Sequence, residues 1–158
     1  MIRYACRSDA DRLTEIAFSA KRHWQYPEEY YQQWTRELTI TDQYITQNIV
    51  KCLLSNSAII GFYSLCFVDK DQLFADIRVE CGYWLDHMFL EEKSIGKGFG
   101  TEMFIDLHKE IRKRNISQFK VFVDPNATGF YEKMGCKFLR NSSSSIKDRI
   151  IPVYEFFS

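Results

Sequence analysis

Three glycines, Gly96, Gly98 and Gly100, alternate with other residues between a strand-like run and an amphipathic helix pattern. The run covers residues 83–90, and the helix pattern begins near residue 100. Glycines at such a junction leave backbone N–H groups uncovered where the positive end of the helix dipole favours an anion. The sequence therefore predicts a loop that binds phosphate or pyrophosphate through its backbone.

Two common phosphate-binding motifs do not fit this glycine spacing. A P-loop needs a lysine after its last glycine, whereas Lys97 lies between two glycines and Thr101 directly follows the last one. A dinucleotide-binding fingerprint has the spacing G-x-G-x-x-G, and here the third glycine comes one residue early. We therefore expect neither of these nucleotide-binding classes.

A second motif follows the predicted helix and a short strand. Residues 124–135 read D-P-N-A-T-G-F-Y-E-K-M-G. Together with the glycine-rich loop, this block resembles the GNAT acyltransferase superfamily, whose motifs are Q/R-x-x-G-x-G/A and P-N-A-x-x-F-Y-E-K-M-G. The loop motif corresponds to residues 95–100, with Ile95 at the usually polar first position. A register that begins at Lys93 restores a polar residue, but the first register puts Gly100 directly before the helix.

The resemblance covers nearly the whole chain and implies a single domain, residues 1–158. It implies a mixed α/β fold whose central sheet is mostly antiparallel and is splayed between the strands that flank the CoA-binding helix. Hydrophobic periodicity and turn residues predict the elements. We expect strands at residues 1–5, 50–54, 58–68, 83–90, 119–123, 137–140 and 149–157, helices at 8–21, from 27 onward, 100–114 and 126–134, and a loop at 142–145.

The first predicted helix has both a start signal and an apolar face. Ser8 is a plausible N-cap because acidic residues follow it in the first turn. Five apolar residues then recur at helical spacing and are predicted to lie in the core. They are Leu13, Ile16, Ala17, Ala20 and Trp24.

The resemblance also implies acetyl-CoA as the co-substrate. The pantetheine arm would pair with the backbone of Met88, Phe89 and Leu90, and Asn126 would bond to it. The pyrophosphate of acetyl-CoA would lie on the glycine-rich loop, and two aromatic residues of the second motif would also contact acetyl-CoA. The residues implied for these two contacts are Ile95, Gly96, Lys97, Gly98, Phe99, Gly100 and Thr101 for the loop, and Phe130 and Tyr131 for the second motif.

The implied chemistry is direct acetyl transfer from the thioester to an amine, without a covalent enzyme intermediate. It needs a group that takes the amine proton, a donor to the oxyanion and an acid for the departing thiolate. The resemblance gives the acid role to Tyr131 and the oxyanion role to a backbone N–H near Phe89. The alternative for Tyr131 is a packing role beneath the cofactor.

The strand before the loop offers two candidates for the base, Asp86 and His87, and Glu80 is a third on the approach to it. Adjacent strand residues point to opposite faces, so at most one of Asp86 and His87 faces the cleft. Histidine has a suitable unperturbed pKa near neutrality, whereas Asp86 would need a raised pKa or a water chain. Each of the three could instead be a structural hydrogen-bonding residue.

An aromatic-rich segment follows the first predicted helix, where the resemblance places the wall of the acceptor site. Trp24, Tyr26 and Tyr30 are predicted to contact the acceptor, which would be a small amine, an amino acid or a peptide N-terminus. The alternative is that about half of the aromatic residues in this segment close the core.

The composition restricts the kinds of partner and ligand that we expect this protein to bind. The formal net charge is zero, so we expect no nucleic-acid partner. The sequence contains no apolar run of about 18 residues, so we expect no membrane span. The five cysteines lack a C-x-x-C pair, and no residues have metal-ligand spacing, so we expect reduced thiols and no metal. With no signal-peptide pattern at the N-terminus, a soluble cytoplasmic protein is expected.

The sequence also allows a homodimer contact and two alternative functions. Residues 150–157 are apolar enough to form a homodimer contact, or they are an ordinary part of the core. The first alternative function is a non-catalytic acyl-CoA sensor, which would bind the cofactor without turnover. The second is an interaction module that has lost CoA, for which Ile95 is the only sequence hint.

Overall fold

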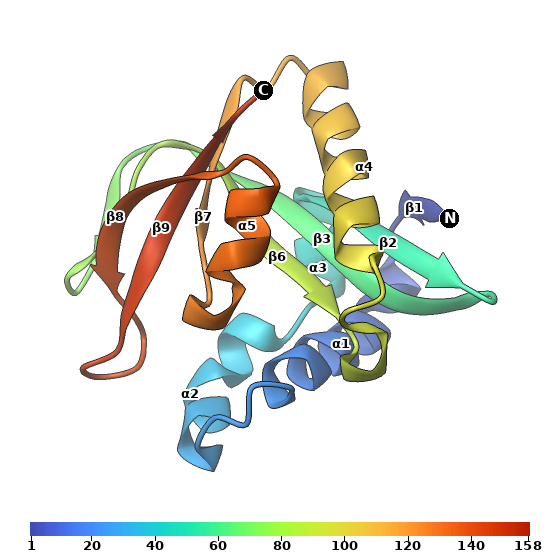
Figure 1. Ribbon diagram of the computed structural model, residues 1–158, viewed down its shortest axis with the longest axis horizontal. Helices are drawn as coiled ribbons and strands as arrows, with labels where there is room; N and C mark the ends of the chain where they lie inside the picture. The colour runs from blue at the N-terminus through green and yellow to red at the C-terminus, as the bar shows by residue number, and fades with distance from the viewer. The chain divides into compact units, whose positions relative to one another are not determined.

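Seven strands form one sheet in the order β1-β2-β3-β6-β7-β9-β8 in the computed structural model, which describes residues 1–158 (Figure 1). Strands β6 and β7 run parallel, whereas β1 with β2, β2 with β3, β7 with β9 and β8 with β9 are antiparallel. The predicted mixed α/β fold with a mostly antiparallel sheet is thus confirmed. The sheet strands are β1 (Ile2–Tyr4), β2 (Ile49–Ser55), β3 (Ala58–Val68), β6 (Gly82–Leu90), β7 (Gln118–Phe122), β8 (Lys137–Ser143) and β9 (Ile150–Phe157).

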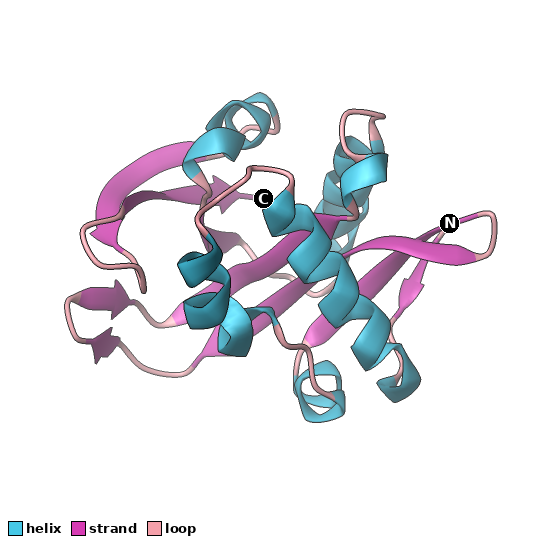
Figure 2. Cartoon of the chain, turned by 90° about the horizontal axis from the view of Figure 1, so that it is seen from below, coloured by secondary structure: helices cyan, strands magenta, loops and turns pink.

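The chain divides into two compact units. The first comprises Met1–Leu65 and His87–Leu107, and the second comprises Cys66–Asp86 and His108–Ser158. Short loops join the helices and strands along the chain (Figure 2).

In the first unit, helices α1 (Ala10–Arg22) and α2 (Glu28–Leu38) contact each other. Both bury apolar residues at intervals of three or four positions, which places these side chains on one helix face. The buried residues are Leu13, Ile16, Ala17 and Ala20 in α1, and Tyr31, Trp34 and Leu38 in α2. Both predicted helices therefore form, and the apolar periodicity predicts the core residues Leu13, Ile16, Ala17 and Ala20 of α1 correctly.

The β2–β3 hairpin of the first unit also forms as predicted. Asn56 and Ser57 both have positive φ values, 48° and 66°, which suit a tight turn matched to the twist of the two strands. The register pairs Cys52 with Phe62, and both side chains are fully buried. Strand β3 lies inside the sheet, as its apolar faces predict.

Helix α4 (Phe99–Lys113) follows the glycine-rich loop and has residues in both units. Phe104, Leu107 and Ile111 recur at helical spacing in its sequence, and all three are buried.

The second unit contains β7, β9 and β8 side by side, together with helix α5 (Thr128–Lys133), which contacts β8 (Figure 1). A 3₁₀ turn at Pro125–Ala127 precedes α5, so the predicted helix over residues 126–134 is shorter than expected. Strand β9 pairs with β7 on one side and β8 on the other. Residues 150–157 therefore lie inside the sheet, whose edge strands are β1 and β8.

Two predictions about the first helix are wrong. A 3₁₀ turn at Arg7–Asp9 precedes α1, and Asp9 rather than Ser8 accepts the Cys6 backbone N–H, at 2.8 Å. Trp24 lies beyond the end of α1 and is 37% exposed, so it is not a core residue.

Three elements were not predicted, and one predicted loop is partly a strand. Helix α3 (Asp42–Gln47) is capped by Thr41, whose hydroxyl accepts the Tyr44 N–H. Strands β4 (Gln72–Phe74) and β5 (Ile77–Val79) form a separate two-stranded sheet. Ser142 and Ser143, expected in a loop, continue strand β8. None of the helices has the length and apolar character needed to span a bilayer.

Candidate functional site

The glycine-rich loop begins with a short 3₁₀ turn at Glu92–Ser94 directly after β6. Gly96 and Gly98 have φ values of +79° and +86°, a region that residues with a Cβ rarely adopt. No atom lies within 4 Å of the position that a Cβ would occupy at either glycine. The backbone at both glycines therefore faces open space and can be approached closely by a ligand.

Helix α4 starts where the loop ends. The Glu102 N–H donates to the Gly98 carbonyl at 3.2 Å, so Phe99, Gly100 and Thr101 form the first turn. The N–H groups of a first helical turn have no acceptor within the helix, and they carry the positive end of its dipole. The N–H groups of residues 99–101 thus lie at the positive end of the α4 dipole, where the glycine spacing predicts an anion.

The end of β6 lies against β3 in the first unit. A Cβ on Gly61 would lie 2.6 Å from Leu90 Cδ2 and 2.8 Å from the Phe89 carbonyl oxygen, so only glycine permits this approach. Met88, Phe89 and Leu90 are half-buried and immediately precede the loop. The structure therefore brings the two predicted contact segments of the cofactor, residues 88–90 and 95–101, into the same unit.

His87 is buried, and both of its ring nitrogens have partners in the first unit. Nδ1 lies 2.8 Å from Ser64 Oγ and 3.2 Å from the Tyr44 hydroxyl, while Nε2 lies 3.1 Å from the Glu37 carbonyl oxygen. The carbonyl can only accept, so Nε2 carries a proton and donates to it. These bonds favour a structural role for His87.

The other two candidates for the base lie in the second unit. Asp86 is exposed, whereas its neighbour His87 is buried, which is the alternation expected of a strand. Glu80 forms an ion pair with Arg140 at 3.0 Å and with Arg78 at 3.3 Å. Burial acts to raise the pKa of Glu80, but the hydrogen bond from Arg140 and the two arginine charges outweigh it and lower this pKa. Glu80 is therefore engaged and poorly suited to accept a proton.

The second motif places its residues in the second unit. Tyr131 is buried, and burial is the main cause that raises the pKa of its hydroxyl, followed by the nearby Cys136 and Asp124. Its ring lies at 5.2 Å from that of Phe130 in an edge-to-face arrangement. Asn126 is exposed, and its backbone and side-chain N–H groups both donate to Asp124, at 2.9 and 3.2 Å.

The aromatic segment forms a cluster of Tyr26, Tyr30, Tyr31 and Trp34, whose ring centroids lie 5.2–5.8 Å apart in contacting pairs. Tyr31 and Trp34 are buried, whereas Tyr26 and Tyr30 are half-buried. The structure thus joins two of the three predicted acceptor contacts, while the ring of Trp24 contacts His23 instead.

Lys21 was not predicted as a site residue. Its Nζ lies 4.7 Å from the ring centroid of Trp34 and 5.9 Å from that of Phe89. It thereby connects the aromatic cluster with the end of β6. No sequence signal distinguishes Lys21 from the other charged residues of α1, because the contact depends on how α1, α2 and β6 pack.

No group of three His, Cys, Asp or Glu side chains is arranged to hold a metal ion.

Comparison with known proteins gives a consistent family. A model of the acetyltransferase (GNAT) domain matches residues 30–152. No curated protein matches the sequence significantly.

Solved structures with the same fold cover nearly the full length of the chain. The PaiA N-acetyltransferase of Thermoplasma acidophilum, solved with coenzyme A, is 20% identical with a TM-score of 0.76, covering 100% of this chain and 98% of that one. An aminoglycoside 6'-N-acetyltransferase, also complexed with coenzyme A, is 15% identical with a TM-score of 0.69 and coverages of 99% and 96%. A ribosomal-protein-alanine N-acetyltransferase from Brucella melitensis is 14% identical with a TM-score of 0.67 and coverages of 100% and 99%.

Proposed function

Because the chain belongs to the GNAT acetyltransferase family, we propose that it moves the acetyl group of acetyl-CoA to a primary amine by direct transfer. The observation that carries this proposal is the loop before α4, where positive φ values at Gly96 and Gly98 leave the backbone open beside the N–H groups of the first helical turn. Such a loop fits the pyrophosphate of CoA. The coenzyme A complexes of two structural neighbours support the same co-substrate.

The residues can be given roles in this chemistry. Acetyl-CoA supplies the activated acetyl group as a thioester. The backbone N–H of Phe89 would donate to the carbonyl oxygen, where negative charge develops as the amine nitrogen attacks the carbonyl carbon. Asp86, the exposed candidate on β6, would accept the amine proton through water.

Tyr131 would protonate the departing thiolate when the bond between the carbonyl carbon and sulfur breaks. Its raised pKa, caused mainly by burial, keeps the hydroxyl protonated near neutral pH, as an acid must be before it acts. Asp86 would then release the amine proton to solvent, and the tyrosinate would take up a proton from solvent, which closes the cycle with no net change in the protein.

Lys21 suggests a class of acceptor. Its ammonium lies 4.7 Å from the ring centroid of Trp34, within the aromatic cluster, and 5.9 Å from that of Phe89. A polyamine would be repelled by this charge, whereas an amino acid or a peptide could place a carboxylate near it. We therefore propose a carboxylate-bearing amine as the acceptor.

The first test is the thermal unfolding midpoint with excess acetyl-CoA, compared with ATP, NAD and buffer. Binding at about 100 times Kd stabilises by roughly 2.7 kcal/mol, which raises Tm by about 5–10 °C in a chain of this size. A rise specific to acetyl-CoA supports the proposal. A rise with ATP or NAD instead, or none with acetyl-CoA, contradicts it.

A pair of glycine variants locates the binding. Gly98→Ala and Gly82→Ala both force alanine into a positive φ, +86° and +125°, without a nearby atom to clash with. Both should lower Tm in the absence of ligand, but only Gly98→Ala should lose the shift with acetyl-CoA. Equal shifts in the two variants would place the binding elsewhere.

A panel of amines then tests turnover by release of free CoA thiol. Amino acids and peptides are compared with polyamines, for the parent protein and for Lys21→Met. The parent should prefer carboxylate-bearing amines, and Lys21→Met should reduce that preference. Binding of acetyl-CoA without turnover of any amine would favour the sensor function instead.

A further inference from the structure

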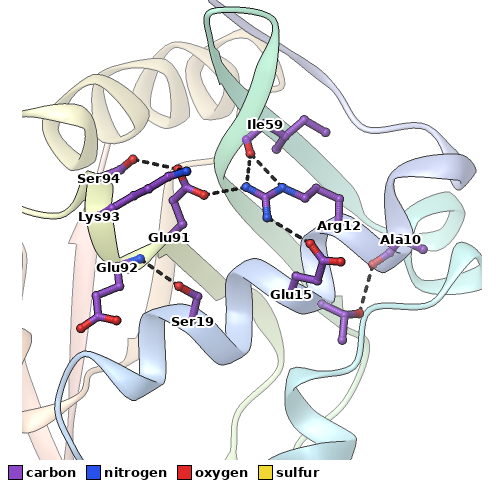
Figure 3. Close-up of polar contacts among 10 residues, drawn as sticks. Ala10, Arg12, Glu15, Ser19, Ile59, Glu91, Glu92, Lys93 and Ser94 are labelled. Carbon is purple, nitrogen blue, oxygen red and sulfur yellow. Dashed lines mark hydrogen bonds and ion pairs between the residues drawn. The ribbon is translucent and has the colours of Figure 1, made fainter.

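Glu91 is the first residue after β6, and its carboxylate is buried within a set of charged partners (Figure 3). Arg12 Nη2 donates to Oε2 at 2.6 Å, Ser94 Oγ donates to Oε1 at 3.2 Å, and Lys93 Nζ lies 3.5 Å from Oε1. Burial acts to raise the pKa of Glu91, but the hydrogen bonds from Arg12 and Ser94 and the nearby positive charges outweigh it, so this pKa is lowered. Glu91 is therefore ionised and held at three points.

Arg12 fixes this carboxylate to the sheet. Its Nε and Nη2 atoms donate to the Ile59 carbonyl oxygen at 3.1 and 2.8 Å, and its Nη1 lies 3.1 Å from Glu15 Oε2. The Glu91 backbone N–H donates to the Ile60 carbonyl at 2.9 Å. One guanidinium thus joins α1, β3 and the start of the loop segment, as Figure 3 shows.

A second bond connects α1 with the next residue of the chain. The Glu92 N–H donates to Ser19 Oγ at 2.9 Å. Ser19 lies seven positions after Arg12, close to two helical turns, so the two side chains project from the same face of α1 (Figure 3). Two polar side chains of α1 thus bind consecutive residues of the loop segment.

These bonds end where the anion-binding backbone begins. Ser94, held by Glu91, is buried, and Gly96 follows it by two residues. Few rotatable bonds separate the anchored Ser94 from the glycines. The direction of the N–H groups at residues 96–101 therefore depends on where Ser94 is held.

We propose that Arg12 and Glu91 are positioning residues for acetyl-CoA, which set the conformation of the glycine-rich loop before the pyrophosphate binds. This inference rests on the proposed function. A loop already held in its binding conformation loses less conformational entropy on binding. Loss of the Glu91 anchor should therefore reduce affinity, separately from its effect on fold stability.

Stability and loop position can be separated with two kinds of variant. Removal of one partner of a buried ion pair leaves the other charge uncompensated, whereas replacement of both partners by apolar residues of similar size often leaves stability intact. Glu91→Gln should therefore lower Tm and loosen the loop. Arg12→Met with Glu91→Met should recover Tm, yet the loop still lacks the anchor for Ser94.

The matched control is the other buried carboxylate bound by an arginine in the same unit. Arg3 donates to both oxygens of Asp9, at 2.8 and 3.1 Å, and Asp9 also caps the turn before α1. Asp9→Asn should lower Tm like Glu91→Gln but should leave the loop unaffected.

The experiment measures three quantities in each variant: Tm, the Kd of acetyl-CoA by calorimetry, and amide hydrogen exchange at residues 92–101 without ligand. Glu91→Gln and the double Met variant should both raise Kd about tenfold or more and speed exchange of the loop amides. Asp9→Asn should change neither. The inference is overturned if the double Met variant binds like the parent, or if Kd rises with falling Tm in every variant, Asp9→Asn included.

The exchange measurement separates this inference from the proposed function. If the parent protein does not bind acetyl-CoA, the proposed function fails, and the inference about acetyl-CoA fails with it. Loop exchange that is faster in Glu91→Gln but not in Asp9→Asn would then still show that the anchor orders the loop. If the parent binds and Glu91→Gln binds equally well, the positioning role fails and the proposed function remains.

Discussion

His87 and Ser64 lie with Nδ1 and Oγ 2.8 Å apart in the interior of the first unit. Nε2 donates to the Glu37 carbonyl, so both ring nitrogens are occupied by hydrogen-bond partners. A general base must instead present an unoccupied nitrogen to the amine or to a water. The packing of His87 thus assigns it to the structure of β6, between β3 and the C-terminal turn of α2.

We predict that His87→Gln lowers the free energy of unfolding by about 1–3 kcal/mol, the usual cost of breaking buried hydrogen bonds, without changing the shape of the pH–rate profile. Urea unfolding and the pH dependence of kcat/KM measure the two effects. Ser64→Ala is the control, because it removes the partner of Nδ1 and keeps the imidazole. A shift of the rising limb of the profile in His87→Gln alone would make His87 the base.

Asp86 and Glu80 should differ sharply in the same assay. Asp86→Asn is expected to lower kcat by about 10²-fold or more if Asp86 takes the amine proton. Glu80→Gln weakens the ion pairs with Arg140 and Arg78, so its main effect should be on Tm. Unchanged turnover in Asp86→Asn would remove it from the mechanism, and loss of turnover in Glu80→Gln at unchanged Tm would transfer the role to Glu80.

Tyr131→Phe tests the acid. The expected result is a fall in kcat of about 10²-fold with the Kd of acetyl-CoA little changed, since the proton is needed only when sulfur departs. Tyr154→Phe is the matched control in the same unit, because the Tyr154 hydroxyl donates to Glu132 at 2.6 Å and has no proposed role in transfer. Equal turnover in the two variants would show that Tyr131 only packs.

Local sequence patterns predict those helices and loops whose conformation depends on neighbouring residues in the chain. The spacing of Leu13, Ile16 and Ala17 predicts α1 because one helical face must be buried. The glycines predict the loop because positive φ is favourable for glycine and unfavourable for residues with a Cβ. The same pattern gives a wrong prediction at Trp24, because the apolar spacing extends beyond Arg22, where α1 ends.

The interactions that were not predicted join residues far apart in the chain. Arg12 and Glu91 are separated by 79 positions, and nothing in either segment alone indicates the other. The choice between Ser8 and Asp9 as the capping residue depends on Arg3, whose guanidinium orients the Asp9 carboxylate. The hairpin of β4 and β5 has only short strands, with too few residues to show an alternating pattern.

Low pH should lower the free energy of unfolding through protonation of Asp9. The hydrogen bonds from Arg3, and then those from Cys6, outweigh burial and lower the pKa of Asp9 from 3.8 to about 2. A depressed pKa stabilises the folded state above about pH 3.8, and this stabilisation is lost as the pH falls through 2. Asp9→Asn should therefore flatten the fall in urea stability between pH 4 and pH 2 by on the order of 1–2 kcal/mol, because half-exposed Arg3 is partly screened. A parent and a variant with equal slopes would contradict this role.

Gly61 should connect fold stability with the cofactor site. An alanine Cβ there would lie 2.6 Å from Leu90 Cδ2 and 2.8 Å from the Phe89 carbonyl oxygen, so the end of β6 must move away from β3. We expect Gly61→Ala to lower the free energy of unfolding by about 1–3 kcal/mol and to weaken acetyl-CoA binding, because the displaced backbone is the one proposed to pair with pantetheine. Gly129→Ala in α5 is the control, since no atom lies within 4 Å of its Cβ position and alanine favours a helix by about 1 kcal/mol over glycine. Chemical unfolding and calorimetry should show loss of both stability and affinity at residue 61 and of neither at residue 129. Intact affinity in a destabilised Gly61→Ala would mean that acetyl-CoA does not depend on the backbone at the end of β6.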